Sequence, residues 1–178
     1  MDYFIIWFKL DYHNQYAIWC TGQKSNLPDQ FYQENGLIPI FENITSLNKY
    51  ATRKNITLIE EKPTIHNLDC VQTWLKTTSK KKYHKELLNA WNFFGDIAAI
   101  EQSSYLHFEK LTQNHLSRYE KLFYAGNILR RDSGNINPKY CEKLTKQDIL
   151  SISIVLRYGF KLLRKSFRYH KAQTLGHI

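Results

Sequence analysis

Two runs of aromatic and β-branched residues open the chain, and they constrain its fold more than any other feature. Tyr3 to Leu10 and Tyr16 to Cys20 are separated by the more polar stretch Asp11 to Gln15. Residues of these types are enriched in strands, so the pattern predicts a β-hairpin with well-buried strands. The next stretch, Thr21 to Gly36, is polar, contains a proline and a glycine, and predicts a loop.

A strand, a helix and a second strand are predicted next. Leu37 to Phe41 and Ile56 to Glu60 have strand-like composition, and Leu47 to Lys54 lies between them as a short helix. Thr45 or Ser46 is the predicted cap of this helix, because hydroxyl side chains accept hydrogen bonds from the first free helical amides. We expect the resulting β-α-β unit to extend the sheet.

After Pro63 the apolar residues recur at three- and four-residue spacing, which is typical of helices. Asn67 is the predicted cap of a first helix. His84 to Gln102 is a long second helix whose apolar surface is too broad for a helix wetted on one side, so we expect it at the centre of the helical layer. Ser117 to Ala125 is a third helix, with Leu122 and Phe123 directed inward.

The last predicted helix has the clearest start signal. Thr145 followed three residues later by Asp148 resembles a capping arrangement, and the apolar register then continues to about Tyr169. Lys80 to Lys82 are a predicted connector and Gly126 to Tyr140 a predicted loop.

The order of these elements predicts an α+β fold in which a small mixed sheet, built from the hairpin and the β-α-β unit, packs against a layer of helices. Residues 1–62 would be mainly sheet and residues 66–170 mainly helical. A chain of 178 residues, 43% of them hydrophobic, suits a single domain spanning residues 1–178. The predicted core includes Trp7, Trp19, Leu87, Trp91 and Phe94.

No apolar run is long enough to span a bilayer, and the first residues lack the basic region of a signal peptide. The three cysteines, Cys20, Cys70 and Cys141, are too few and too irregularly spaced for a disulfide framework. These features predict a cytoplasmic protein with no membrane partner.

The net charge of +9 is unevenly distributed along the chain. Residues 145–178 carry seven basic side chains against one acidic side chain, whereas residues 27–70 carry six acidic side chains against four basic ones. We therefore expect two electrostatic faces. The acidic residues of the second segment are Asp29, Glu34, Glu42, Glu60, Glu61 and Asp69.

Residues that could support catalysis or bind a metal are sparse. The seven histidines include no pair at helical spacing, and the sequence contains neither an HExxH nor a CxxC motif. His66, Asp69 and Cys70 lie together at a helix start, where a thiolate could be activated. The structural interpretation, in which Asn67 or Asp69 caps the helix and Cys70 packs inward, is favoured. We therefore predict no catalytic residues, no metal and no cofactor.

A polar stripe crosses the predicted central helix at Asn89, Asn92 and Asp96. It is either the one wetted edge of the helix, which is the favoured interpretation, or a buried network that bonds to the backbone. Whether the stripe is buried stays open from the sequence.

The C-terminal helix carries Lys161, Arg164, Lys165 and Arg168 among aromatic residues. Such a segment can bind phosphates, anionic lipid or an acidic protein, and nucleic-acid binding is the alternative function. The favoured interpretation is a core helix whose outer face is solvated by basic side chains.

Two segments, Leu87 to Ala98 and Tyr119 to Asn127, resemble stretches of immunity proteins from bacterial contact-dependent growth inhibition and related polymorphic toxin systems. The similarity also takes in the strand-helix-strand pattern at Leu37 to Glu60. The resemblance implies a cytosolic protein without enzymatic activity that binds and neutralises the C-terminal nuclease domain of a cognate toxin. The oligomeric state stays open.

Nuclease toxins of such systems are often basic, and a basic inhibitor would be repelled unless it presented an acidic surface. The acidic residues between positions 27 and 70 are therefore the predicted toxin-binding residues, and the basic C-terminal helix is expected to face away.

Overall fold

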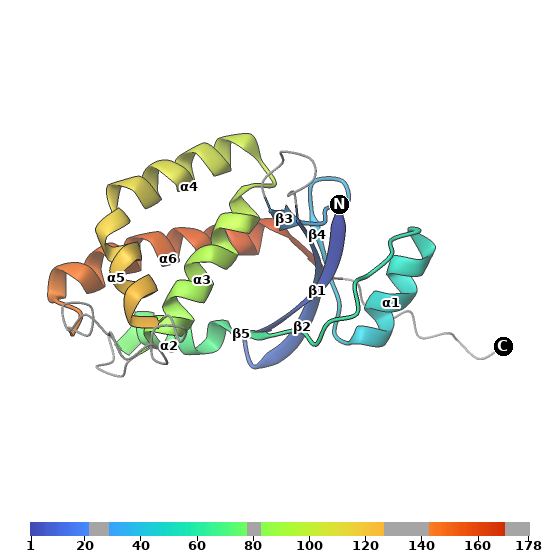
Figure 1. The fold of residues 1–178 in the computed structure, drawn as a ribbon, viewed down its shortest axis with the longest axis horizontal. Helices are drawn as coiled ribbons and strands as arrows, with labels where there is room; N and C mark the ends of the chain where they lie inside the picture. The colour runs from blue at the N-terminus through green and yellow to red at the C-terminus, as the bar shows by residue number, and fades with distance from the viewer. Residues whose placement is uncertain (22–28, 78–82, 127–142, 170–178) are drawn as a thin grey trace.

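The computed structural model describes residues 1–21, 29–77, 83–126 and 143–169, and it confirms the predicted α+β class (Figure 1). A four-stranded mixed sheet stands between one helix on one side and a group of helices on the other. Its strand order is β3-β2-β1-β5. The strands are β1 Asp2–Leu10, β2 His13–Thr21, β3 Gln30–Phe31 and β5 Ile65–Asn67.

The predicted hairpin is confirmed, with a tighter turn than expected, but its strands are less buried than predicted, since in β1 only Phe8 and Leu10 are buried. β1 and β2 pair antiparallel up to Leu10 and His13, so Asp11 and Tyr12 alone form the turn. Both have positive φ values, 52° and 66°, as a turn matching the strand twist requires. The amide of Tyr12 donates to the carboxylate of Asp69 at 3.1 Å, which ties the turn to the start of helix α2.

The predicted helix near residue 50 is α1, Ile44–Arg53, but its predicted cap is wrong. Asn43 caps it, with the side-chain oxygen of Asn43 accepting from the Ser46 amide at 2.8 Å. Asn43 lies three residues before that amide, the spacing at which a capping side chain reaches a free amide. Thr45 and Ser46 lie inside the first turn instead.

The expected β-α-β unit is also wrong, because its two strands do not join one sheet. β4, Ile38–Ile40, pairs parallel with β6, Phe167–Tyr169, in a separate two-stranded sheet. Ile56 to Glu60 makes one isolated bridge, between Leu58 and Tyr3. The Glu61 amide then bonds to the Ile59 carbonyl, a local turn that interrupts pairing, and β5 becomes the parallel neighbour of β1.

Five helices form the layer on the other side of the sheet (Figure 1). Helix α3 contacts the other four, which confirms its predicted central position. The helices are α2 Leu68–Thr77, α3 His84–Ala98, α4 Gln102–Asn114, α5 Leu116–Gly126 and α6 Lys146–Ser166.

The predicted helix from His84 to Gln102 is too long. α3 ends at Ala98, and a tight turn leads into α4, which was not predicted. Neither glycine nor proline marks this break, and Phe108 is the one fully buried residue of α4. Both helix-stop and periodicity signals are therefore weak there.

The predicted capping arrangement of the last helix is confirmed. The Asp148 amide donates to Thr145 Oγ1 at 3.1 Å, and the Thr145 amide donates to Asp148 Oδ2 at 2.9 Å. Burial alone would raise the pKa of Asp148, but hydrogen bonds from Lys121 and Thr145 outweigh it and lower that pKa. The helix ends at Ser166 rather than Tyr169, because the next three residues form β6 beside β4.

Gly159 lets α6 approach α3 closely. A Cβ atom at this position would lie 2.1 Å from Cδ2 of Phe94, far inside van der Waals contact. The absence of a side chain at Gly159 therefore accommodates the Phe94 ring at the crossing of the two helices.

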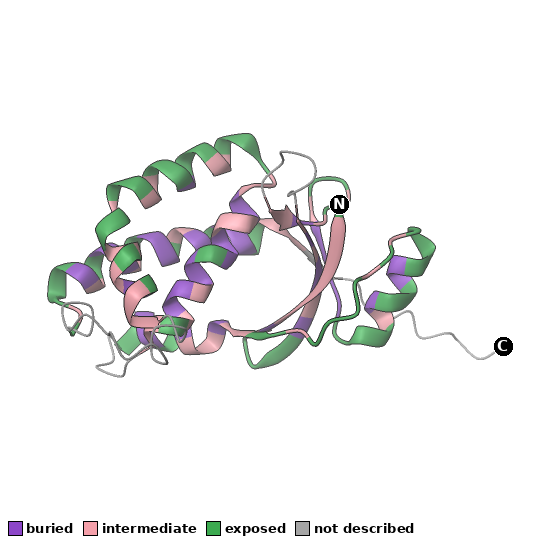
Figure 2. Cartoon of the chain, in the orientation of Figure 1, coloured by how far each residue is buried: buried purple, intermediate pink, exposed green. Residues whose placement is uncertain are grey.

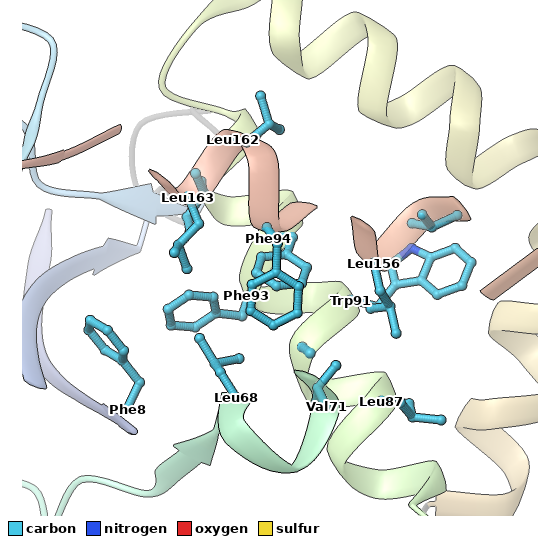
Figure 3. Packing of buried hydrophobic residues seen from close by; sticks show 14 of the residues in the cluster. Phe8, Leu68, Val71, Leu87, Trp91, Phe93, Phe94, Leu156, Leu162 and Leu163 are labelled. Atoms are coloured by element: carbon cyan, nitrogen blue, oxygen red, sulfur yellow. The ribbon is translucent and has the colours of Figure 1, made fainter. Parts of the chain in front are cut away.

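Both faces of the sheet are covered by hydrophobic clusters. The larger cluster joins Phe8 of β1 to α2, α3 and α6 (Figure 3). The smaller one joins Ile18 of β2 to Leu47 and Tyr50 of α1 on the opposite face, where α1 shows buried positions toward the sheet (Figure 2). Successive side chains of a strand point to opposite faces of the sheet. Because both faces are covered here, apolar residues follow one another along the strands instead of alternating with polar ones.

The predicted core residues Leu87, Trp91 and Phe94 are confirmed, with exposures of 0%, 1% and 0%. Trp19 is half-buried and packs against the larger cluster. Trp7 was wrongly placed in the core: it is half-buried and belongs to neither cluster. Its ring stacks on Tyr16 instead. The inward orientation predicted for Phe123 is also wrong, since its side chain is 40% exposed.

Lys80 to Lys82, Cys141 and nearly all of the predicted loop at Gly126 to Tyr140 lie outside the described residues. Within the described ranges, none of the helices combines the length and apolar character that crossing a bilayer requires.

Candidate functional site

A cleft of about 500 Å³ opens where α3, α4 and α5 meet the residue that precedes β3. We call it the acidic cleft, because carboxylates from three separate parts of the chain line it. These are Asp29, Asp96 of α3 and Glu109 of α4. Four aromatic rings complete its walls: Trp91, Tyr105, Phe108 and Tyr119.

Helix α3 supplies the floor of the acidic cleft through the polar stripe. Asn92 and Asp96 lie four residues apart and therefore share one helix face. Asn92 is exposed, whereas Asn89 and Asp96 are half-buried. Asn92 accepts a hydrogen bond from the Tyr119 hydroxyl at 3.0 Å, and Asp96 accepts one from the Trp19 indole at 3.0 Å. The stripe is thus partly wetted, and its buried end bonds to side chains rather than to backbone.

Burial perturbs the carboxylate of Asp96 in the acidic cleft. Burial raises its pKa to about 7, the negative charge of Asp29 adds to the rise, and the hydrogen bond from Trp19 opposes it without cancelling it. Removing a carboxylate from water disfavours its charged form, and a second negative charge does the same. Asp96 therefore changes charge near neutral pH, and an arriving cation would favour the ionised form.

Hydrogen bonds and ring contacts hold the aromatic wall in place. The Trp91 indole donates to the Thr112 hydroxyl at 3.1 Å, which joins α3 to α4. The rings of Trp91 and Tyr119 meet edge to face with centroids 5.6 Å apart, which joins α3 to α5. The rings of Trp91 and Tyr119 are therefore each held by a neighbouring helix.

The structure separates the six predicted toxin-binding residues. Asp29 lines the acidic cleft. Glu34 pairs with Lys54 and accepts from the Tyr50 hydroxyl, so it stabilises the packing of α1. Asp69 anchors the hairpin turn through Tyr12. Glu42 is exposed just before α1, and Glu60 and Glu61 are exposed beyond that helix.

Glu60 and Glu61 border a second hollow, between α1 and the segment that follows it. This α1 groove has a volume of about 570 Å³ and is lined by apolar side chains that include Ile44 and Ile59. Those two isoleucines are 38% and 39% exposed. The lining of the α1 groove is thus mostly apolar and also includes Glu60, Glu61 and Lys62.

The alternative basic face is split between two elements. Lys161, Arg164 and Lys165 are exposed near the end of α6. Lys165 lies 3.4 Å from the carboxylate of Glu101. Arg168 belongs to β6, not to the helix as predicted.

The environment of His66 and Cys70 favours their structural interpretation. His66 lies in β5 with its ring against Phe93, and burial lowers the pKa of its imidazole. Burial raises the pKa of the Cys70 thiol, and the charges of Glu86 and Asp69 raise it further. A reactive cysteine needs the opposite shift. Asn67 accepts from the Cys70 amide at 3.2 Å, which confirms it as the predicted cap.

No group of three or more metal-ligating side chains occurs among the residues the structure describes.

Sequence reasoning missed Glu109 and the aromatic wall of the acidic cleft. Glu109 lies on α4, whose existence was not predicted, and nothing in its sequence neighbourhood distinguishes it from a solvated helix residue. The sequence marks Asp96 as part of the polar stripe and Asp29 as part of the acidic segment, but their proximity depends on tertiary structure. Comparisons with protein-family models, curated proteins and solved structures found no significant match to this chain.

Proposed function

We propose that this chain is a cytosolic immunity protein that binds and neutralises the C-terminal nuclease domain of a bacterial toxin and has no catalysis of its own. The observation that carries the proposal is the acidic cleft, in which a chain of net charge +9 gathers Asp29, Asp96 and Glu109 beside four aromatic rings. The resemblance of two of its segments to immunity proteins of polymorphic toxin systems supports it.

The acidic cleft has the chemistry that a basic partner needs. A nuclease domain handles a polyanion and presents Lys and Arg side chains for that purpose. Aromatic residues are enriched in the centres of protein interfaces, and opposite charges across an interface increase the association rate and exclude wrong partners. Burying the positive side chains of the nuclease in an acidic cleft would remove its contacts to nucleic acid.

The pKa shifts of the Cys70 thiol and the His66 imidazole also fit an inhibitor better than an enzyme. The thiol is held protonated and the imidazole is packed against Phe93, so neither is prepared as a nucleophile or base.

Co-expression tests this function. The gene neighbourhood is searched first for a large upstream reading frame that ends in a nuclease-like domain, and that domain is then produced in bacterial cells with and without the chain. We expect growth arrest without the chain, normal growth with it, and co-purification of the two proteins as a complex. Growth arrest that persists despite abundant folded chain would contradict the proposal.

Nucleic-acid binding is the second candidate, and the exposure of Lys161, Arg164 and Lys165 on α6 favours it. It predicts an affinity for DNA or RNA that falls steeply as salt rises. A filter-binding assay at two salt concentrations separates the two functions, because the immunity protein should bind neither.

A further inference from the structure

We propose that the acidic cleft is a receptor for an arginine side chain of a protein partner, whose guanidinium lies against the aromatic wall and bonds to the carboxylates of Asp96 and Glu109. This inference rests on the proposed function for the identity of the partner, but recognition of a guanidinium by the chain stands and is testable without it.

The charge of the acidic cleft selects a cation. Of the described residues that line it, three are acidic and none is basic. The volume of about 500 Å³ lies in the range of clefts that enclose a ligand group. In a chain with 25 basic residues, such a lining gives a local potential opposite to the net charge and favours a positive guest.

Among the described residues, the hydrogen bonds inside the acidic cleft leave oxygen atoms of Asp96 and Glu109 as charged acceptors for a guest. The oxygen of Asn92 is used by Tyr119, and the hydroxyl of Thr112 is used by Trp91. Asp96 accepts from Trp19 through Oδ2 alone, as far as the described residues show. Its Oδ1 atom and the exposed Glu109 carboxylate therefore remain for a donor with several N–H groups.

Arginine is the side chain that presents several hydrogen-bond donors in one plane. A guanidinium has five N–H donors in a fixed plane, bonds to carboxylates in pairs and stacks on aromatic faces. The half-buried rings of Tyr105 and Tyr119 offer such faces beside the carboxylates, whereas Trp91 and Phe108 also line the cleft but are only 1% and 3% exposed. A lysine ammonium is a compact, strongly hydrated charge and makes less use of a flat aromatic wall.

The protonation of Asp96 would regulate this binding. The titratable groups around it are Asp29, Glu109, Tyr105 and Tyr119. The pKa of Asp96 is about 7, so part of the population carries a protonated carboxyl at neutral pH. A bound guanidinium favours the charged form, and binding therefore strengthens as pH rises from 6 to 8 and releases protons.

The test uses the indole resonances of the whole, ¹⁵N-labelled chain. Two of its four tryptophans report on the acidic cleft: Trp91 lines it and Trp19 bonds to Asp96. Trp7 and Trp74 are internal controls. The probe is N-acetyl-arginine amide, which represents an arginine within a protein, and N-acetyl-citrulline amide is the neutral control of the same shape.

We expect N-acetyl-arginine amide to shift the Trp19 and Trp91 indole signals with a dissociation constant in the range of about 1–10 mM at pH 8. At pH 6 the affinity should be at least about threefold weaker. The citrulline compound should cause no saturable shift.

Variants show whether the carboxylates are responsible. Asp96→Asn and Glu109→Gln should each weaken arginine amide binding about fivefold or more, and Glu109 is exposed, so its replacement leaves the fold intact. Glu120→Gln removes the same charge from an exposed position on α5 outside the lining and should change nothing.

Three results would overturn the proposal: equal shifts with the citrulline compound, equal affinity for lysine amide acetylated on its α-nitrogen, or a loss of affinity in Glu120→Gln as large as in Glu109→Gln. A chain that binds arginine amide as described but fails to protect cells would instead refute the proposed function alone.

Discussion

The indole nitrogen of Trp19 donates a hydrogen bond of 3.0 Å to the carboxylate of Asp96, and this bond joins strand β2 to helix α3. The two residues are 77 positions apart in the sequence. The bond fixes the buried end of the acidic cleft to the sheet. It is also too weak to offset the burial of the carboxylate, since the pKa of Asp96 stays at about 7. The charged form of Asp96 therefore destabilises the fold of the free chain.

Asp96→Asn should stabilise the protein at high pH. Because the folded-state pKa of about 7 exceeds the usual value, the folded chain binds a proton that the unfolded chain releases between about pH 4 and pH 7. Stability is therefore lost as pH rises through that window. Asparagine keeps an acceptor for Trp19 without the charge, so we expect a gain of roughly 2–4 kcal/mol at pH 8 and little change at pH 4.

Urea unfolding of both proteins at pH 4, 6 and 8 measures this difference. An Asp96→Asn variant that is destabilised equally at all three values would show that the carboxylate is not strained by burial.

Gly159→Ala should be strongly destabilising. Alanine is the better helix former by about 1 kcal/mol, so an open helical site would gain stability from this change. At Gly159 the added Cβ would lie 2.1 Å from the Phe94 ring, and α6 must move away from α3. We expect a loss of roughly 2 kcal/mol or more, in the range of overpacked cores.

Gly95→Ala is the matched control, because its Cβ would meet the Phe108 ring at an ordinary 3.6 Å. Thermal unfolding should show Gly95→Ala at or above the stability of the unaltered protein. Equal effects of the two substitutions would mean that the α3–α6 approach is looser than described.

Trp91→Ala should cost roughly 3–5 kcal/mol of folding free energy, the range for emptying a large aromatic site. Trp91 is 1% exposed and connects α3 to α4 through Thr112. Thr112→Val, which removes the hydrogen bond alone, should cost only about 1–2 kcal/mol. Equilibrium denaturation measures both, and a loss below about 1 kcal/mol for Trp91→Ala would be incompatible with a central α3.

The sequence predicts those helices and strands of this fold that are marked by residues within or next to the element itself. The hairpin follows from its composition, and α6 follows from the Thr145 and Asp148 capping box. By contrast, β5 and β6 have three residues each and form only because β1 and β4 offer parallel neighbours. The α3–α4 break lacks a local stop signal altogether. Short strands and unmarked turns depend on tertiary partners, which a pattern of residues does not contain.

In the candidate site, too, some residues are marked by the sequence and others are brought in only by the fold. Asp96 and Asp29 each stood out in the sequence, one by its place on an apolar helix and the other by the charge of its segment. Only the folding of α4 and α5 over α3 brings Glu109 and the aromatic wall to them. Asp69 and Glu34 belong to the same acidic segment as Asp29. In the structure, however, Asp69 stabilises the hairpin turn and Glu34 stabilises the packing of α1.

Cys70→Ser and His66→Ala should keep the proposed toxin binding. The thiol is held in its protonated form and the imidazole is packed against Phe93, so neither is expected to act in function. Protection of toxin-producing cells by each variant is the measurement, with folding checked by circular dichroism. A variant that folds normally but no longer protects would support an enzymatic role for this pair.

The most direct test of the account is the affinity of the toxin's C-terminal domain for charge-reversed variants at two salt concentrations. Asp29→Lys combined with Glu109→Lys should weaken binding at least tenfold, about 1.4 kcal/mol, and Glu60→Lys combined with Glu61→Lys shows what the α1 groove adds. Lys161→Glu, Arg164→Glu and Lys165→Glu together should have a much smaller effect. Unchanged affinity after reversal of the acidic cleft, with a large loss from the α6 reversals, would contradict the account and identify the basic helix as the binding face.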